Sequence, residues 1–221
     1  MKKIIALTLA ALVLGFSLQA HADLFDRGTD AFGNKLIYDS DLDVTWYDLT
    51  YSSTNWNDAV IWAGGLSVTF NEAVYDDWRL PTTVDDLYSW GYDGTTTAGY
   101  NITSSELGYL FTELGNKGYY AIDGTNPQPG WGFTNTGDFQ DLEPDVYWSD
   151  TEYSADSNNA WYFLYSHGGQ GKGNKSAGNS ALAVRSGDVA PPVAPEPVSS
   201  ILFLIGGVTL GLRRFKRAIV Q

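Results

Sequence analysis

The sequence predicts an α+β fold with few short helices, short antiparallel strands and much loop. Two segments, 56–63 and 103–114, space their apolar residues as amphipathic helices do, and a further short helix is expected after Pro81. Other segments are rich in aromatic and aliphatic residues, which is typical of strands. These strand candidates lie at 36–48, 146–148, 160–165 and 181–185.

The first and last of the expected helices carry their own end signals. Asn55 can cap the first helix, and Gly64 and Gly65 would end it. Thr103 and Glu106 have the spacing of a capping box, in which two side chains satisfy the free N–H groups at a helix start. These signals predict where both helices begin and where the first one ends.

The strand candidates differ in how they are connected. The segment 36–48 predicts two short strands around an Asp-rich turn. The segment 167–180, rich in Gly, Asn and Lys, predicts a loose hairpin loop between two later strands. A phosphate-binding loop is excluded there, because Gly173 follows Lys172 where Ser or Thr is needed.

The N-terminal segment has the three parts of an export signal. Lys2 and Lys3 precede an apolar run, and Ala20 and Ala22 form a small-residue cleavage site. Residues 1–22 are therefore expected to be a secretory signal peptide, recognised by the secretion machinery and removed from the exported protein.

The C-terminal segment also has three parts in a fixed order. A Pro-rich linker, 189–197, reads as a stiff extended segment and leads into an apolar run of 15 residues at 198–212. As a helix that run is about 22 Å long, against roughly 30 Å for a hydrocarbon core. We therefore expect a single short transmembrane segment that holds the protein only temporarily, followed by a basic cytoplasmic tail at 213–221.

This tail resembles the PEP-CTERM sorting signal of exopolysaccharide-producing Gram-negative bacteria. The matching residues are Pro195, Glu196 and Pro197, then the apolar run, then Arg213, Arg214, Lys216 and Arg217. The resemblance implies that an exosortase recognises and cleaves the chain near Pro-Glu-Pro. It also implies a transient stay at the inner membrane, and then the cell surface or extracellular matrix as destination.

The domain between the two signals, residues 23–188, is strongly acidic and has no cysteine. It holds 25 acidic against seven basic residues, a net charge of −18. That balance excludes nucleic acid as a partner, because phosphate binding needs a basic footprint. It leaves open a merely solvated surface, cation binding, and contact with basic or neutral polymers.

Five short motifs in this domain occur in order along the chain. They are Trp56-Asn57-Asp58-Ala59, Trp78-Arg79-Leu80-Pro81-Thr82, Tyr147-Trp148-Ser149-Asp150, Trp161-Tyr162-Phe163 and Ala183-Val184-Arg185-Ser186-Gly187. As a set, from about residue 36 to 188, they resemble the family named for the C-terminal module of a collagen-like bacterial adhesin (Lcl C-terminal). The resemblance implies a C-type-lectin-like mixed fold, and the best understood member of that family binds sulfated polysaccharide. The acidic charge of this domain argues against that ligand.

Calcium is the one cofactor that the sequence suggests. Asp39, Asp41 and Asp43 alternate, so a strand would place all three carboxylates on one face. An EF-hand is excluded, because Val44 stands where glycine is needed and Thr50 where glutamate is needed. A calcium site of another kind, or simple solvation, remains open.

Arg79 and Arg185 have two interpretations, a clamp for an anion or structural ion pairs with carboxylates such as Asp76 or Asp77. Catalytic equipment is sparse, since the exported part has no cysteine nucleophile and only one histidine, His167.

We therefore expect no enzyme, but an exported surface or exopolysaccharide-matrix protein whose domain is structural or binds a ligand such as extracellular polysaccharide. The alternatives are a calcium-dependent carbohydrate-binding adhesin and a secreted hydrolase that uses a carboxylate pair. The many aromatic residues fit a packed core or a sugar-binding face.

Overall fold

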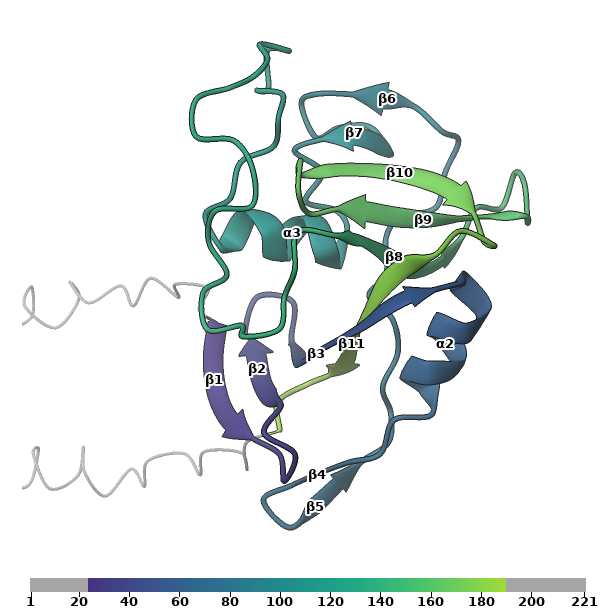
Figure 1. Ribbon diagram of the computed structural model, residues 1–221. Helices are drawn as coiled ribbons and strands as arrows, with labels where there is room; N and C mark the ends of the chain where they lie inside the picture. The colour runs from purple at the N-terminus through teal and green to yellow at the C-terminus, as the bar shows by residue number, and fades with distance from the viewer. Residues whose placement is uncertain (1–23, 190–221) are drawn as a thin grey trace, which may run out of the picture. The chain divides into compact units, whose positions relative to one another are not determined.

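β-strands dominate the described part of this chain, residues 24–189 of the 221, in a computed structural model. Of these, residues 24–187 form one compact unit. Nine strands make one sheet in the order β1-β2-β3-β11-β8-β9-β10-β7-β6 (Figure 1). Their bounds are β1 Leu24–Thr29, β2 Lys35–Asp39, β3 Val44–Thr54, β6 Trp90–Gly91, β7 Ala98–Tyr100, β8 Val146–Glu152, β9 Asn159–Leu164, β10 Gly169–Asn174 and β11 Asn179–Ser186.

The sheet is mixed, and its centre is formed by strands distant in sequence. β11, the last strand, pairs antiparallel with β3 and parallel with β8. β6 and β7 at the far edge are also parallel, and the remaining neighbours are antiparallel. A separate hairpin, β4 (Val68–Phe70) with β5 (Ala73–Tyr75), lies outside the large sheet (Figure 1).

Two short helices are present in the described residues, and the expected α+β, C-type-lectin-like mixed fold is therefore wrong: this domain is mostly β. α2 spans Trp56–Gly64, with Asn55 accepting a hydrogen bond from the Asp58 N–H as its cap. α3 spans Glu106–Glu113. The expected helix after Pro81 is absent, and residues 81–89 form no helix or strand.

The missing helix has a physical cause. Val84 and Leu87, which an amphipathic helix would bury, are 53% and 75% exposed. The backbone of this segment is held by side chains instead: the Thr83 N–H donates to Thr151 Oγ1, and the Ser89 N–H donates to Thr97 Oγ1. The segment therefore gains hydrogen bonds from β8 and from the residue before β7, without forming a helix of its own.

The expected hairpin loop at 167–180 is also wrong, because β10 runs through it. Aromatic rings of the neighbouring strands cover its glycines: a Cβ on Gly171 would lie 2.9 Å from the Tyr162 hydroxyl, and one on Gly173 would lie 3.1 Å from the Tyr162 ring. Tyr100 covers Gly169 in the same way. Glycine here makes room for packing on a strand, a use distinct from its role in loops.

Aromatic side chains form much of the core. Trp46, Trp148 and Trp161 are fully buried, as are Tyr147 and Tyr165. The main apolar cluster joins β2 and β3, α3, and β8 and β9. Many of the aromatic residues therefore pack in the core, which is one of the two uses that the composition allows.

No helix among residues 24–189 is long and apolar enough to cross a membrane. The segment 198–212, on which the short membrane segment was expected, lies outside the described residues.

Candidate functional site

Three of the sequence motifs meet at one place in the fold. Arg79 and Val184 exchange backbone hydrogen bonds of 2.9 and 2.8 Å, and the Asp150 N–H donates to the Pro81 carbonyl at 2.8 Å. The motifs therefore join the segment after the β4–β5 hairpin to β11 and to β8. This junction is structural, because the groups involved bind one another.

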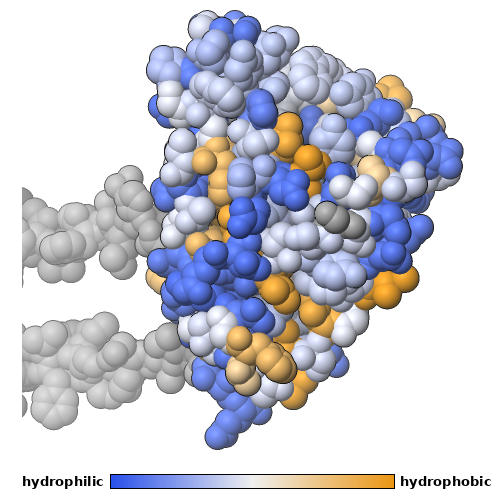
Figure 2. Space-filling view, in the orientation of Figure 1, coloured by the Kyte–Doolittle hydropathy of each residue, from blue (hydrophilic) through white to orange (hydrophobic). Residues whose placement is uncertain are grey.

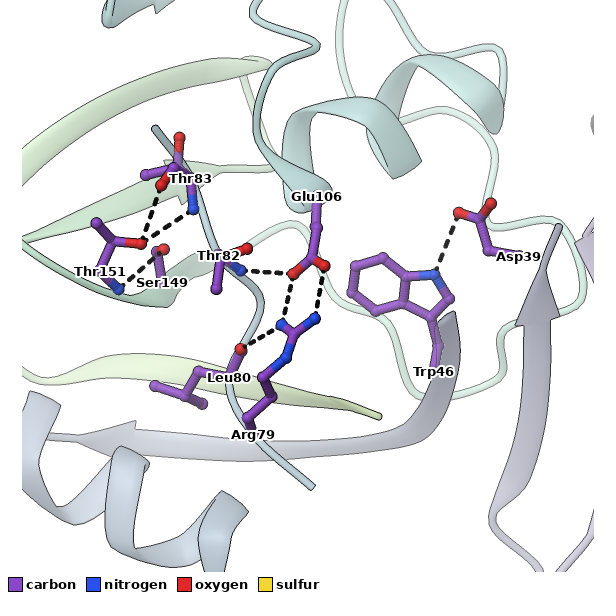
Figure 3. A network of polar contacts seen from close by, with 9 residues as sticks. All are labelled: Asp39, Trp46, Arg79, Leu80, Thr82, Thr83, Glu106, Ser149 and Thr151. Atoms are coloured by element: carbon purple, nitrogen blue, oxygen red, sulfur yellow. Dashed lines mark hydrogen bonds and ion pairs between the residues drawn. The ribbon is translucent and has the colours of Figure 1, made fainter. Parts of the chain in front are cut away.

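Arg79 is committed to an internal ion pair. Its guanidinium donates to both carboxylate oxygens of Glu106, at 2.7 and 2.8 Å, and to the Leu80 carbonyl (Figure 3). The hydrogen bond to Glu106 is the main reason why the pKa of Arg79 is raised. Glu106 also accepts the Thr82 N–H at 2.6 Å, which fixes the start of α3 to this segment.

The ion-pair interpretation of the two arginines is confirmed. Of their two partners, Asp77 was expected and Glu106 was not. Arg185 donates to both oxygens of Asp77, at 2.8 and 3.1 Å, and lowers the pKa of that carboxyl. The expected capping box is wrong, because Ser105 caps α3 by accepting the Gly108 N–H. Glu106 turns to Arg79 instead.

The three candidate calcium ligands each have separate partners. Asp39 is buried, accepts the N–H groups of Asp41 and Leu42, and lies 3.5 Å from Trp46 Nε1 (Figure 3). Asp41 accepts the Tyr109 hydroxyl, and Asp43 accepts the hydroxyl of Tyr38. Within residues 24–189 no group of three or more His, Asp or Glu side chains is placed to hold a metal ion.

The processing residues of the predicted signals lie outside the described residues. These are Ala20 and Ala22 at the N-terminal end, and Pro195, Glu196, Pro197, Arg213, Arg214, Lys216 and Arg217 at the C-terminal end.

A pocket of about 660 Å³ lies between α3 and the long segment that follows it. Phe111 of α3 and Phe163 of β9 contribute its apolar part, and both are almost fully buried, so little of each ring is open. The polar residues that line it are Asn101, Asn116, Lys117, Asp123 and Gln128, with Thr112 on the α3 side. The sequence did not predict any of them as site residues, because all except Thr112 lie in loop-like, polar stretches.

Side-chain amides give the pocket rim its shape. The Asn116 carbonyl oxygen accepts the N–H groups of Thr134 and Asn135, at 2.8 and 2.9 Å. Gln128 Nε2 donates to two backbone carbonyls, and so does Asn101 Nδ2. Their carbonyl oxygens, Oε1 of Gln128 and Oδ1 of Asn101, accept no hydrogen bond from residues 24–189. The rim therefore offers acceptors that are already fixed in place.

Close backbone approaches also shape the pocket wall. A Cβ on Gly168 would lie 2.5 Å from the Phe111 ring and 2.8 Å from the Gly118 Cα, and Gly168 has a φ of +69°. Glycine is required there because both the space and the backbone conformation exclude a side chain.

Lys117 is the one basic residue of the described domain that is free at this pocket. The other six contact acids or aromatic rings; they are Arg27, Lys35, Arg79, Lys172, Lys175 and Arg185. Lys117 is exposed and has no ion-pair partner among residues 24–189. It can therefore donate to a ligand in the pocket.

A group of tyrosines borders the pocket through Asn101. Tyr120 lies 4.6 Å from Tyr92 and 4.8 Å from Tyr100, measured between ring centres, and Asn101 donates to the backbone of Tyr92 and Tyr120. Burial raises the pKa of Tyr100, so its phenol stays neutral at ordinary pH. These rings support the rim from the side of β7.

A second pocket, of about 540 Å³, is lined only by polar residues around the start of α2. Lys175 lies at its edge, where it pairs with Glu152 and sits 4.0 Å from the Trp56 ring centre. No apolar side chain lines it, so the larger pocket is the better candidate for a sugar ring or another organic ligand.

Comparison with known proteins gave no significant match: no family model fits the sequence, no curated protein is similar to it, and no solved structure resembles it.

Proposed function

We propose that this chain is an exported surface or exopolysaccharide-matrix protein whose domain binds a neutral glycan without catalysing a reaction. The observation that supports this most is the larger pocket, which combines open aliphatic carbon with fixed amide oxygens. Its volume of about 660 Å³ is within the usual range for small-ligand sites.

The pocket chemistry matches that of a sugar ring. A pyranose has C–H faces that pack on aromatic or aliphatic carbon and hydroxyl groups that donate and accept hydrogen bonds. Ile122, which is 69% exposed, and the half-buried Ala121 supply the carbon, and Asn101 and Gln128 supply acceptors for hydroxyl groups. Because these acceptors are held in place by their own amide N–H groups, little order is lost on binding.

The charge of the domain favours a neutral ligand. With 25 acidic and seven basic residues between the two signals, the domain repels polyanions. Figure 2 shows hydrophilic residues over most of one face, with small hydrophobic groups between them. A neutral polysaccharide can approach this surface without an electrostatic cost.

Absence of catalysis is part of the proposal. Glycoside hydrolysis needs two carboxyl groups at the bond that is cleaved. Asp123 is the only acidic residue among those that line the larger pocket. Ser166 Oγ and His167 Nδ1 lie 2.9 Å apart, but no carboxylate of residues 24–189 hydrogen-bonds to that histidine, so the pair lacks the third member of a triad.

A glycan array probed with the protein recovered from cells tests the binding proposal. We expect retention on neutral glycans, weaker or no retention on sulfated and uronate-rich glycans, and the same pattern with calcium or with a chelator. No release of shorter products should follow long incubation. Binding that disappears with chelator would favour the calcium-dependent adhesin, and product release would favour the hydrolase.

Export and processing are proposed from the terminal signals, with an exosortase as the processing partner. Replacing Pro195, Glu196 and Pro197 by alanine should leave the tail attached, since the recognition motif is gone. Intact mass spectrometry of protein from cells and from matrix measures this directly. A variant that keeps the mass and location of the unaltered protein would overturn the sorting proposal.

A further inference from the structure

The segment leading to the β6 edge of the sheet exposes large apolar side chains close together. Val84, Leu87, Tyr88 and Trp90 are 53%, 75%, 41% and 50% exposed. None of the four lines the larger pocket. An exposed group of this kind marks a contact surface more often than single exposed residues do.

Both aromatic rings on this segment are supported from behind. Tyr88 stacks on the fully buried Trp161, with ring centres 6.2 Å apart and an angle of 19° between the planes. Trp90 meets Tyr100 edge-on, at 5.9 Å and 86°. The rings are therefore held in fixed orientations while they remain exposed.

The backbone under the rings is also fixed. Thr97 Oγ1 accepts the Ser89 N–H at 3.0 Å and donates to the Leu87 carbonyl at 2.9 Å. The Ala98 N–H donates to the Ser89 carbonyl. A surface ordered before binding loses little conformational freedom when a ligand arrives.

Polar groups lie beside the rings. Lys172 Nζ is 5.4 Å from the Tyr88 ring centre and 4.6 Å from that of Tyr153. Asp85 accepts the indole N–H of Trp161, the buried ring on which Tyr88 stacks, at 2.9 Å. Exposed rings next to hydrogen-bonding groups are the combination that a sugar chain uses, with its C–H faces on the rings and its hydroxyl groups on the polar side chains.

We propose that Tyr88 and Trp90 form a second binding surface, a platform for a neutral polysaccharide chain, so that one domain holds polymer at two places. The proposal rests on the proposed function in that the ligand class is the same, but it stands on a separate set of residues.

Charge favours polysaccharide over a second copy of the protein. Two domains with 25 acidic against seven basic residues repel each other when they meet. β6 has only two residues, Trp90 and Gly91, so strand pairing between copies would add few hydrogen bonds. A neutral polymer meets neither obstacle.

Two sites on one domain change how binding depends on ligand length. A long chain that engages both sites gains from the high effective concentration of the second contact, by on the order of a hundredfold. A trisaccharide can fill only one site. The protein should therefore bind long neutral polymers much more tightly than short fragments of them.

The test uses the protein recovered from cells and three neutral polymers: hydroxyethylcellulose, galactomannan and dextran. Affinity electrophoresis measures binding of the polymers, and calorimetry measures binding of the matching trisaccharides. The platform variant is the double substitution Tyr88→Ala with Trp90→Ala. Phe32→Ala is its control, because Phe32 is 90% exposed on the β1–β2 turn and no ring stack supports it. Thr112→Trp, which places an indole over the larger pocket, is the pocket variant.

The expected result is a polymer affinity at least about tenfold weaker for the platform variant, with its trisaccharide binding and melting temperature close to those of the unaltered protein. Phe32→Ala should leave all values unchanged. The proposal is overturned if the platform variant binds polymer as the unaltered protein does. It is also overturned if that variant only dissociates a dimer in sedimentation analysis.

The two proposals fail in different ways. Loss of all binding in Thr112→Trp, with normal binding in the platform variant, would support the pocket and reject the platform. If the platform variant loses polymer binding while Thr112→Trp binds polymer as the unaltered protein does, the platform is supported and the pocket is rejected as the glycan site. No binding of any polymer or trisaccharide by the unaltered protein would reject both.

Discussion

Arg79 holds Glu106 through two nearly equal hydrogen bonds, of 2.7 Å from Nη1 and 2.8 Å from Nη2. The side chains of the two residues are 30% and 15% exposed, so water competes little for them. The pair ties the first turn of α3 to the segment that pairs with β11. Since α3 forms one side of the larger pocket, this contact also helps to position the site.

Glu106→Gln should lower the free energy of unfolding by about 2 kcal/mol, because it removes the charge from a paired, partly buried group and leaves Arg79 without its partner. Urea unfolding at pH 7 measures the change. Asp77→Asn is the matched control: its pair with Arg185 is more exposed on the acid side, at 54%, so the loss should stay below about 1 kcal/mol. Equal losses in both variants would contradict the structural weight given to Glu106.

Asp30 should stabilise the fold in a pH-dependent way. Burial alone would raise its pKa, but Tyr47 Oη at 2.6 Å and the N–H groups of Phe32 and Asn34 together hold the pKa below the ordinary 3.8. The folded protein therefore binds this proton less readily than the unfolded chain. The stabilisation is fully present above about pH 4 and is lost as the pH falls through the lower folded value.

Asp30→Asn should flatten the acid limb of a stability curve measured between pH 6 and pH 2.5, and lower stability above pH 4. The ionisation of Asp48 has the opposite effect on stability, because burial raises the pKa of this carboxyl despite the N–H donors of Gln140 and Asp141. Its ionisation costs stability as the pH rises from the ordinary value through the raised one, and Asp48→Asn should remove that fall. An acid limb that stays as steep in Asp30→Asn would count against the assignment.

Two helix glycines should respond in opposite directions to alanine. A Cβ on Gly108 of α3 would lie 2.0 Å from the Ile102 carbonyl oxygen and 2.8 Å from Ser105 Oγ, so the helix would have to move. Gly108→Ala should cost about 3 kcal/mol. Gly64 at the end of α2 has no atom within 4 Å of the added carbon, and Gly64→Ala should be neutral or stabilising by up to about 1 kcal/mol. Thermal unfolding of both variants checks this, and similar effects would contradict the packing described around Gly108.

Local signals predicted what local physics controls. Asn55 and the glycines after it set the ends of α2, and the two strands around the Asp-rich turn also follow from neighbouring residues. Predictions from the sequence were wrong where the interacting residues are distant along the chain. Glu106 has capping-box spacing, but its carboxylate binds Arg79, 27 residues earlier. No short-range pattern in the sequence indicates that partner.

The hairpin loop predicted at 167–180, where β10 lies, was wrong for the same reason. Its glycines are typical of a loop until the Tyr162 ring, on the adjacent strand, is placed over them. The larger pocket was not predicted either, because it combines α3 with residues near 101, 118, 128 and 168. Each of these is an ordinary loop residue by itself, and only the order of the strands brings them together.

The most direct test of the account is a calorimetric titration of Thr112→Trp and Thr112→Val with the neutral oligosaccharide that the array identifies. Thr112 is exposed on α3 and lines the larger pocket, so an indole there blocks the pocket without entering the core. Valine removes only the hydroxyl that donates to the Gly108 carbonyl and keeps the size. We expect that Thr112→Trp loses oligosaccharide binding while Thr112→Val and the unaltered protein bind alike. Undiminished binding by Thr112→Trp would contradict it.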